Sequence, residues 1–214
     1  MKHRIVIFGG SGFIGSATKE TFNESYEIVA PTRKECDVIK HPEKIGEYIQ
    51  EGDIVYNFVG EIPHGIFYMG LLRKTNYVAA INILNVAIQK KAWKIILAGT
   101  AKDNPSGYTI WKHAAAIEYI TQKKIQAVVL AYTNIYGKGG KGVINQLEKR
   151  IKRNEDCILI AEKEVIDFIY IKDVVEINKK AIDLKHGQYY AGSRTKTSLV
   201  EVARILKNYL GPFD

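Results

Sequence analysis

The feature that most constrains this chain is a glycine-rich segment near its start, with Gly9, Gly12 and Gly15 at three-residue spacing. It directly follows the apolar run 5–8 and precedes a stretch of helical periodicity. Glycine at a strand-to-helix turn permits a tight turn and lets the backbone approach a pyrophosphate, while the helix N-terminus offers free N–H groups to the anion. An ordinary turn is the alternative. The segment predicts a dinucleotide site formed by Gly9, Ser11, Gly12, Phe13, Ile14 and Gly15.

Apolar runs alternate with helical patterns over most of the chain, which predicts a parallel sheet covered by helices on both faces. We expect strands at 4–8, 27–31, 54–59, 94–98 and 126–131, and helices at 13–23, 42–51, 71–91 and 111–123. Beyond residue 142 we expect a helix, a strand at 157–160, an extended run 167–171, a helix from 173, a strand at 188–191 and a helix at 198–210. The predicted fold class is α/β, a Rossmann-type doubly wound parallel sheet in residues 1–140. Residues 141–214 are predicted to form a small C-terminal substrate-facing lobe, interleaved with the last sheet strands.

Composition narrows the class of protein. With 46% hydrophobic and 25% charged residues and no apolar run near the roughly 18 residues that span a bilayer, the chain reads as a cytoplasmic protein without a membrane partner or signal peptide. Its two cysteines, Cys36 and Cys157, suit a reducing compartment. The histidines at 64, 113 and 186 lack metal-ligand spacing, so no metal is expected. The net charge is +8, but the basic residues are not interleaved with aromatic ones. We therefore expect the protein to bind an anionic small molecule rather than nucleic acid.

The residues after the second expected strand bear on the choice of cofactor. An NAD site usually carries an acidic residue there for the ribose 2′-hydroxyl, whereas this chain has Arg33 and Lys34. Arg33 can bind a 2′-phosphate through two hydrogen bonds, so NADP is favoured over NAD. The alternative is that both cations point to solvent. Asp37 and Val38 are expected at the adenine edge, although Asp37 is equally suited to cap a helix.

A candidate catalytic set follows the fourth expected strand. Thr100 ends that strand, and Tyr108 and Lys112 are four residues apart, which places them one turn apart on a helix. A phenol is a weak acid at neutral pH until a nearby cation lowers its pKa, and Lys112 can supply that charge. The Thr100 hydroxyl can hydrogen-bond a carbonyl or alcohol oxygen. This set predicts proton transfer beside a nicotinamide hydride.

Together with the glycine segment, these residues make the chain resemble the extended group of the short-chain dehydrogenase/reductase superfamily, which contains nucleotide-sugar epimerases, dehydratases and 4-ketoreductases. The resemblance covers nearly the whole chain, and its further motifs lie at 57–60, 76–78, 130–137, 167–174 and 198–203. It implies that Thr100 polarises the substrate oxygen, that Tyr108 exchanges the proton and that Lys112 binds the nicotinamide ribose. It also implies a cofactor channel lined by Phe58, Val59 and Gly60, with Tyr132 by the nicotinamide and Asn134 facing the nucleotide sugar. Because the long helix expected at 71–91 and the one that carries Lys112 often form a dimer bundle in the superfamily, the resemblance also implies a homodimer.

The chain departs from the family pattern around the expected substrate. Thr100 and Tyr108 are only eight residues apart, where members usually have a much longer loop, and Ala131 and Ile166 stand where members often have arginine. Members are also commonly longer at the C-terminus, so the substrate region is expected to be small.

The sequence therefore predicts an NADP-dependent reductase or epimerase that acts on the keto group of a nucleotide-activated sugar. Dehydration is disfavoured because no carboxylate follows Thr100 directly. Two alternatives stay open: a non-catalytic NADP-binding or redox-sensing module, and a reductase of a carbonyl substrate without a nucleotide.

Overall fold

A computed structural model describes residues 4–62, 69–156 and 164–210. The strand expected at 157–160 lies outside these ranges, as do Cys157 and His64. The chain divides into two compact units: Met1–Tyr132 with Val175–Ala191, called unit 1 here, and Thr133–Val174 with Gly192–Asp214, called unit 2. The boundary expected at residue 141 stays a prediction.

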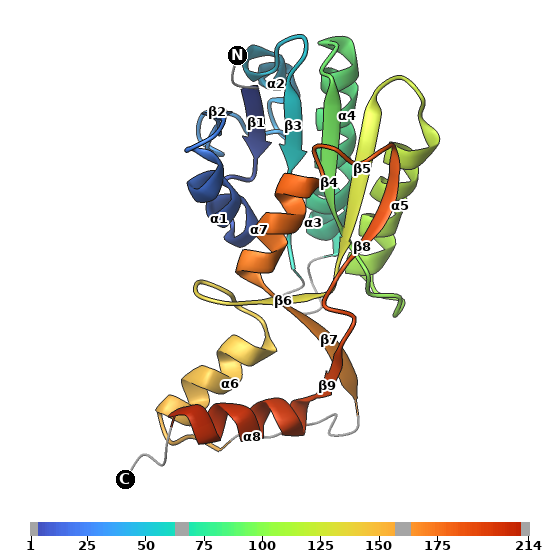
Figure 1. The fold of residues 1–214 in the computed structure, drawn as a ribbon. Helices are drawn as coiled ribbons and strands as arrows, with labels where there is room; N and C mark the ends of the chain where they lie inside the picture. Colours follow the sequence, from blue (N-terminus) through green and yellow to red (C-terminus); the bar gives the residue numbers. More distant parts are fainter. Residues whose placement is uncertain (1–3, 63–68, 157–163, 211–214) are drawn as a thin grey trace. The chain divides into compact units, whose positions relative to one another are not determined.

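Unit 1 is built on a six-stranded parallel sheet with the order β2-β1-β3-β4-β5-β8 (Figure 1). Its strands are β1 (Arg4–Phe8), β2 (Glu27–Val29), β3 (Ile54–Asn57), β4 (Lys94–Thr100), β5 (Gln126–Tyr132) and β8 (Gly187–Ala191). Every neighbouring pair in this sheet is parallel. The order reverses between β1 and β3, the kind of switch point at which doubly wound sheets bind ligands beyond the carboxyl ends of the strands. The predicted fold class is thereby confirmed.

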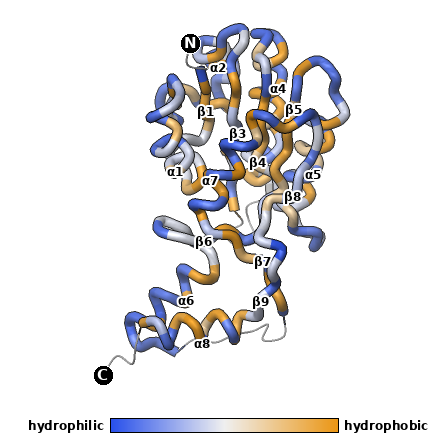
Figure 2. The backbone as a smooth tube through the Cα atoms, in the orientation of Figure 1, coloured by the Kyte–Doolittle hydropathy of each residue, from blue (hydrophilic) through white to orange (hydrophobic). Residues whose placement is uncertain are grey.

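The helices of unit 1 cover both faces of the sheet because the strands are apolar on both sides. One face, carrying Val6, Val55 and Leu97, packs in a single core cluster with residues of α4 (Ala79–Gln89) and α5 (Gly107–Thr121). The other face carries Tyr56, whose ring meets Phe22 of α1 (Phe13–Phe22) edge-on at 5.7 Å. Figure 2 shows the hydrophobic residues concentrated along the central strands, as expected for a sheet buried on both faces.

Several elements differ from their predicted bounds for local reasons. α5 begins at Gly107 rather than Trp111, because Ser106 caps it and accepts a bond from the Thr109 N–H. The helix expected at 42–51 is a 3₁₀ turn, Pro42–Lys44, followed by the single α-turn α2, Ile45–Tyr48. The helix expected at 71–91 is interrupted: α3 (Met69–Arg73) passes through a π-helical turn (Lys74–Val78) into α4.

Unit 2 contains a three-stranded mixed sheet of order β6-β7-β9. Its elements are β6 (Asn134–Tyr136), α6 (Val143–Lys152), β7 (Val165–Tyr170), β9 (Lys196–Ser198) and α8 (Leu199–Leu210), while α7 (Ile171–Lys180) begins in unit 2 and ends in unit 1. β7 pairs parallel with β6 and antiparallel with β9. The three-residue strands β6 and β9 were not predicted, because runs this short carry little periodicity. Hydrophobic and hydrophilic residues alternate along α8 (Figure 2).

Among the described residues, none of the helices combines the length and the apolar character that crossing a membrane requires.

Candidate active site

The glycine segment forms a turn in which Gly9 and Gly15 have no room for a Cβ atom. Gly9 has a φ of +82°, and a Cβ there would lie 2.7 Å from the carbonyl carbon of Phe58. A Cβ on Gly15 would lie 2.2 Å from the Gly9 oxygen, well below any real contact distance. The Gly12 N–H donates to that same oxygen at 3.0 Å. The sequence motif is therefore a steric requirement of the β1-to-α1 connection.

The N-terminus of α1 is not capped by a side chain: Gly12 occupies the N-cap position in extended backbone. Ser11 and Gly12 are exposed, and Phe13 and Ile14 are half-buried. An uncapped helix N-terminus next to a glycine turn at the carboxyl end of β1 fits a pyrophosphate, which needs N–H donors and close backbone approach. The residues present therefore fit a dinucleotide, and Gly9 to Gly15 would hold its phosphates.

The turn after β2 is organised by two carboxylates. Glu35 accepts hydrogen bonds from the backbone N–H and the hydroxyl of Thr32, at 2.7 and 2.8 Å, and these bonds lower its pKa. Arg33 is mostly exposed and lies 3.3 Å, Nε to Oδ2, from Asp37. Asp37 Oδ1 also accepts hydrogen bonds from the N–H groups of Ile39 and Lys40. Its carboxylate therefore caps the backbone that follows it, as in the alternative to an adenine contact. Arg33 is thus held at the exit of β2 with its guanidinium in solvent.

Val38 is buried, and its carbonyl accepts a hydrogen bond from the Asn82 amide at 2.8 Å, which ties the turn after β2 to α4.

After β3, the Val59 N–H donates to Asn57 Oδ1 at 3.0 Å, and Asn57 donates to the Tyr119 hydroxyl at 3.1 Å. Phe58 and Val59 remain half-buried and Gly60 is exposed. The predicted channel residues therefore follow directly on the carboxyl end of a central strand.

Gly60 brings the β3 end next to the candidate catalytic lysine. A Cβ on Gly60 would lie 3.1 Å from both Asn76 Oδ1 and Lys112 Nζ. Asn76 is buried in the π-helical turn and bonds both backbone groups of Glu61, at 3.0 Å to the N–H and 2.9 Å to the oxygen. Asn76 thus fixes the chain beside Lys112, and π-turns often occur at functional sites.

Thr100 and Tyr108 come together despite the short loop that joins them. Burial raises the pKa of Tyr108, and the nearby Thr100 side chain lowers it by a smaller amount. Lys112 is buried, and its Nζ donates to the Ala98 oxygen at 2.8 Å. Burial lowers the pKa of Lys112 to about 8. The expectation that Lys112 brings down the pKa of Tyr108 is not met by these contacts, because the ammonium is directed at β4.

These three side chains have the chemistry for proton transfer to or from an oxygen. The phenol of Tyr108 is a donor and acceptor at a half-buried position, and the Thr100 hydroxyl beside it offers one donor and two acceptor sites. Lys112 has three N–H donors, of which the contact with Ala98 takes one.

Tyr132 is expected beside a nicotinamide, which stays a prediction. Its hydroxyl is buried and bonds Asn178 Oδ1 of α7. Asn178 also donates to Thr18 Oγ1 at 2.8 Å, and its backbone oxygen accepts from the Tyr56 hydroxyl at 2.7 Å. The phenol of Tyr132 is therefore used in a buried network with α1, β3 and α7. A single sequence carries no signal for such a network.

Asn134, the expected substrate contact, begins β6 in unit 2 and is half-buried opposite Phe168 of β7. Ala131 is buried in β5, and Ile166 is half-buried in β7. The neighbouring Asp167 carboxylate is buried and accepts bonds from Ser193 N–H, Ser193 hydroxyl and Arg194 N–H, at 3.0, 2.7 and 2.9 Å.

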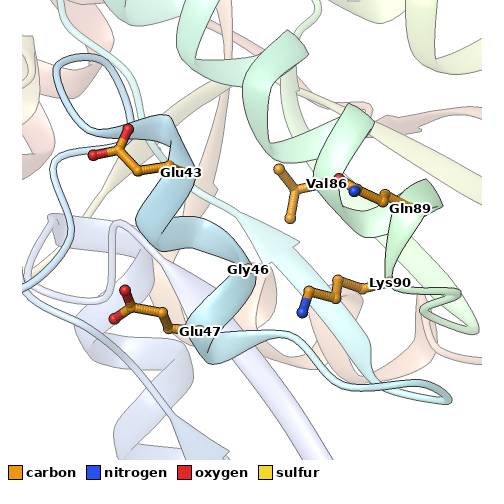
Figure 3. Close-up of a pocket in the computed structure, with 6 residues that line it drawn as sticks. All are labelled: Glu43, Gly46, Glu47, Val86, Gln89 and Lys90. Atoms are coloured by element: carbon orange, nitrogen blue, oxygen red, sulfur yellow. The ribbon is translucent and has the colours of Figure 1, made fainter.

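A surface hollow of about 530 Å³ lies elsewhere on unit 1, between α2 and the last residues of α4 (Figure 3). It is lined by Glu43, Gly46, Glu47, Val86, Gln89 and Lys90. None of the predicted site residues lines it. Two carboxylates in its wall disfavour a phosphate-bearing ligand. Within the part of the chain that the structure describes, no cluster of three potential metal-ligating side chains occurs.

The comparisons with known proteins agree with a nucleotide-binding α/β enzyme. Residues 5–191 match the model of the NAD dependent epimerase/dehydratase family, and the chain belongs to this family. A curated relative, a putative UDP-glucose 4-epimerase of Methanocaldococcus jannaschii, is 24% identical, with 97% of this chain and 82% of the relative covered.

Solved structures share the fold at lower identity. The UDP-glucose 4-epimerase of Thermotoga maritima, solved with UDP-glucose, superposes with a TM-score of 0.82 at 20% identity, covering 96% of this chain and 82% of that one. WbmG of Bordetella bronchiseptica, solved with NAD, gives 0.85 at 18%, covering 99% and 79%. The GDP-mannoheptose C4 reductase of Campylobacter jejuni, solved with NADP, gives 0.82 at 18%, covering 98% and 84%. Members of this fold thus bind either dinucleotide.

Proposed function

We propose that this protein is an NADP-dependent reductase or epimerase that acts on the keto group of a nucleotide-activated sugar. The observation that carries the proposal is the proximity of the Thr100 and Tyr108 side chains, at the end of β4 and the start of α5. The chain that carries them belongs to the epimerase/dehydratase family. Bound NADP would supply a hydride acceptor or donor. Tyr108 gives or takes the proton at the substrate oxygen, and the Thr100 hydroxyl holds that oxygen by a hydrogen bond.

We assign the remaining predicted site residues to the cofactor and the substrate. Gly9 to Gly15 hold the pyrophosphate, Lys112 binds the nicotinamide ribose, and Gly60 leaves space in front of Lys112. In unit 2, Asn134 contacts the nucleotide sugar, and residues 141–214 face the substrate. We further propose a homodimer.

The preference for NADP rests on the exit of β2, where Arg33 is exposed and held by Asp37. A guanidinium on a short, capped turn can form two charge-assisted hydrogen bonds to a 2′-phosphate at little additional entropic cost. Asp37 would then share Arg33 with the phosphate, so we expect NADP to bind more tightly than NAD.

The test is oxidation of NADPH with a panel of 4-keto sugar nucleotides, run together with an assay for interconversion of sugar epimers. Turnover of one of them supports the proposal and distinguishes reduction from epimerisation. Tight NADPH binding with no turnover on the whole panel would overturn it in favour of a non-catalytic module. Thermal stabilisation by NADP and NAD, and by UDP, GDP, dTDP and CDP, identifies the cofactor and the base, because a ligand that binds only the folded state raises its stability.

A further inference from the structure

The loop 101–106 connects β4 to α5, and hydrogen bonds fix it along its length. At its start, the Ala101 N–H donates to the Tyr132 oxygen at 2.8 Å. The Lys102 N–H donates to Thr100 Oγ1 at 3.2 Å, so this loop contacts the hydroxyl that lowers the pKa of Tyr108. The orientation of Thr100 therefore depends on where the backbone of Lys102 is held.

Two side chains of α5 hold this loop from the other side. Thr109 is buried; its hydroxyl donates to the Asn104 oxygen at 2.6 Å and accepts from the Ser106 N–H at 2.9 Å. His113 is half-buried, and its Nε2 lies 2.8 Å from the Lys102 oxygen. A carbonyl oxygen only accepts, so Nε2 carries the proton in this contact.

Thr109 and His113 are four residues apart, each one position after Tyr108 and Lys112. One residue is about 100° of helix rotation, so α5 carries two adjacent stripes, each with a one-turn spacing. The first stripe contains the candidate catalytic pair, Tyr108 and Lys112. The second stripe contains Thr109 and His113, which bond the loop that contacts Thr100. His113 is thereby linked through the Lys102 backbone and the Thr100 hydroxyl to Tyr108.

We propose that Thr109 and His113 are positioning residues: they hold the loop 101–106 so that the Lys102 backbone orients the Thr100 hydroxyl beside Tyr108. The proposal rests on the proposed function, since it assigns a role in that proton transfer. A hydroxyl has two acceptor sites and one donor. With Lys102 N–H at one acceptor site, the Thr100 side chain keeps one rotamer and its O–H is directed to the reacting oxygen or to Tyr108.

The first experiment compares three variants. His113→Phe keeps a ring but loses the N–H, His113→Gln keeps an N–H donor, and His41→Phe is a matched control at an exposed histidine that contacts Glu43. We expect His113→Phe to lower kcat by about tenfold, because misplacement of a catalytic group by a fraction of an ångström is costly, with the KM for substrate and the Kd for NADPH changed far less. His113→Gln should recover much of the loss, and His41→Phe should match the wild type. Equal kcat in all three would overturn the proposal.

A double-mutant cycle separates positioning from general weakening of the fold. Thr100→Val removes the hydroxyl that His113 is proposed to orient. If His113 acts through Thr100, the double variant Thr100→Val/His113→Phe loses no more activity than Thr100→Val alone. Additive losses would overturn the proposal.

Amide hydrogen exchange tests the same link without any turnover. We expect the Lys102 amide to exchange about tenfold faster in His113→Phe than in the wild type, His113→Gln and His41→Phe, because the Lys102 backbone loses its contact to α5. Unchanged exchange would overturn the proposal even in an active enzyme. Absence of turnover in the wild type would instead overturn the proposed function, and the exchange result would still decide whether His113 holds the loop.

Discussion

The ammonium of Lys112 donates to the main-chain oxygen of Ala98 at 2.8 Å, and the lysine is buried there. The lysine of the candidate catalytic set is therefore anchored to the strand that ends in Thr100. A buried cation on a central strand has consequences for stability, for pH dependence and for the neighbouring phenol.

Lys112 makes stability depend on pH in a direction that can be worked out. Burial lowers its pKa to about 8 from 10.5, so above pH 8 the unfolded chain holds a proton that the folded chain has lost. The wild type therefore gains stability as pH rises from 8 to 10.5. Relative to Lys112→Met, it should gain about 2 kcal/mol between pH 7 and pH 9.5. Urea unfolding of both proteins at the two pH values measures this, and a constant difference would contradict it.

Tyr108 is expected to carry the proton, so its hydroxyl should matter for turnover and little for cofactor binding. Tyr108→Phe should lower turnover by at least about a hundredfold, since general acid–base catalysis contributes that much or more. NADPH affinity, measured by fluorescence titration, should stay within a few-fold of the wild type. Tyr209→Phe, at a side chain that is 90% exposed, is the matched control. Full activity in Tyr108→Phe would show that another group is the acid.

Gly15 has no room for a methyl group, whereas Gly70 of α3 has no neighbouring atom within 4 Å of a Cβ position. Gly15→Ala should therefore distort the glycine turn, destabilise unit 1 by about 1–3 kcal/mol and weaken NADPH binding at least about tenfold. Gly70→Ala should leave both properties close to the wild type. Thermal unfolding with and without NADPH reads out both effects, and a normal NADPH response in Gly15→Ala would argue against phosphate binding at this turn.

Arg33 should decide the cofactor preference. Arg33→Gln removes the guanidinium and should lower the ratio of NADP to NAD affinity about tenfold or more. This is the loss of affinity expected when one charge-assisted hydrogen bond is removed. Lys34→Gln, which removes the neighbouring cation, should have a smaller effect. Calorimetric titration with both dinucleotides measures the ratio, and equal ratios in Arg33→Gln and the wild type would contradict a 2′-phosphate contact.

Asn178 joins three elements through buried groups, so its loss leaves polar partners unsatisfied. Asn178→Leu removes the partner of the Tyr132 hydroxyl and the donor to Thr18, and should destabilise the protein by about 2 kcal/mol or more. Adding Tyr132→Phe should cost less in this background than in the wild type, because the hydroxyl it removes is already unpaired. Denaturant unfolding of the four proteins tests the coupling, and additive losses would contradict it.

Much of the fold follows from the sequence because strand and helix periods are local. The bounds of β1 match the strand expected at 4–8, and the burial of the sheet on both faces follows from its nearly uninterrupted apolar residues. The glycine segment is local in part: the Gly9 oxygen leaves no room for a Cβ on Gly15, whereas Gly9 itself is restricted by Phe58, at the end of another strand. The spacing that places Tyr108 and Lys112 one turn apart on a single helix was also predicted from the sequence, and both lie on α5.

Other features depend on partners far along the chain. Lys94 was expected only as the first residue of a strand, yet it is buried, and its Nζ bonds the oxygens of Ile182 and Leu184. We expected α5 to begin at Trp111, four residues after its actual start at Gly107. The residues before Trp111 are typical of a turn, and the local sequence does not show that Ser106 caps a helix there.

The sequence by itself determined the family and the parallel sheet, and it named the residues that we propose for binding a dinucleotide and for proton transfer. Only the tertiary structure decided how those residues are supported: Lys112 by Ala98, Tyr132 by Asn178, and Thr100 by a loop that His113 holds. The physical reason is that side-chain polarity says a buried group must find a partner, while the chain's path through space decides which one. Thr18 and Asn178, 160 residues apart, meet only because α1 and α7 pack on the same face of the sheet.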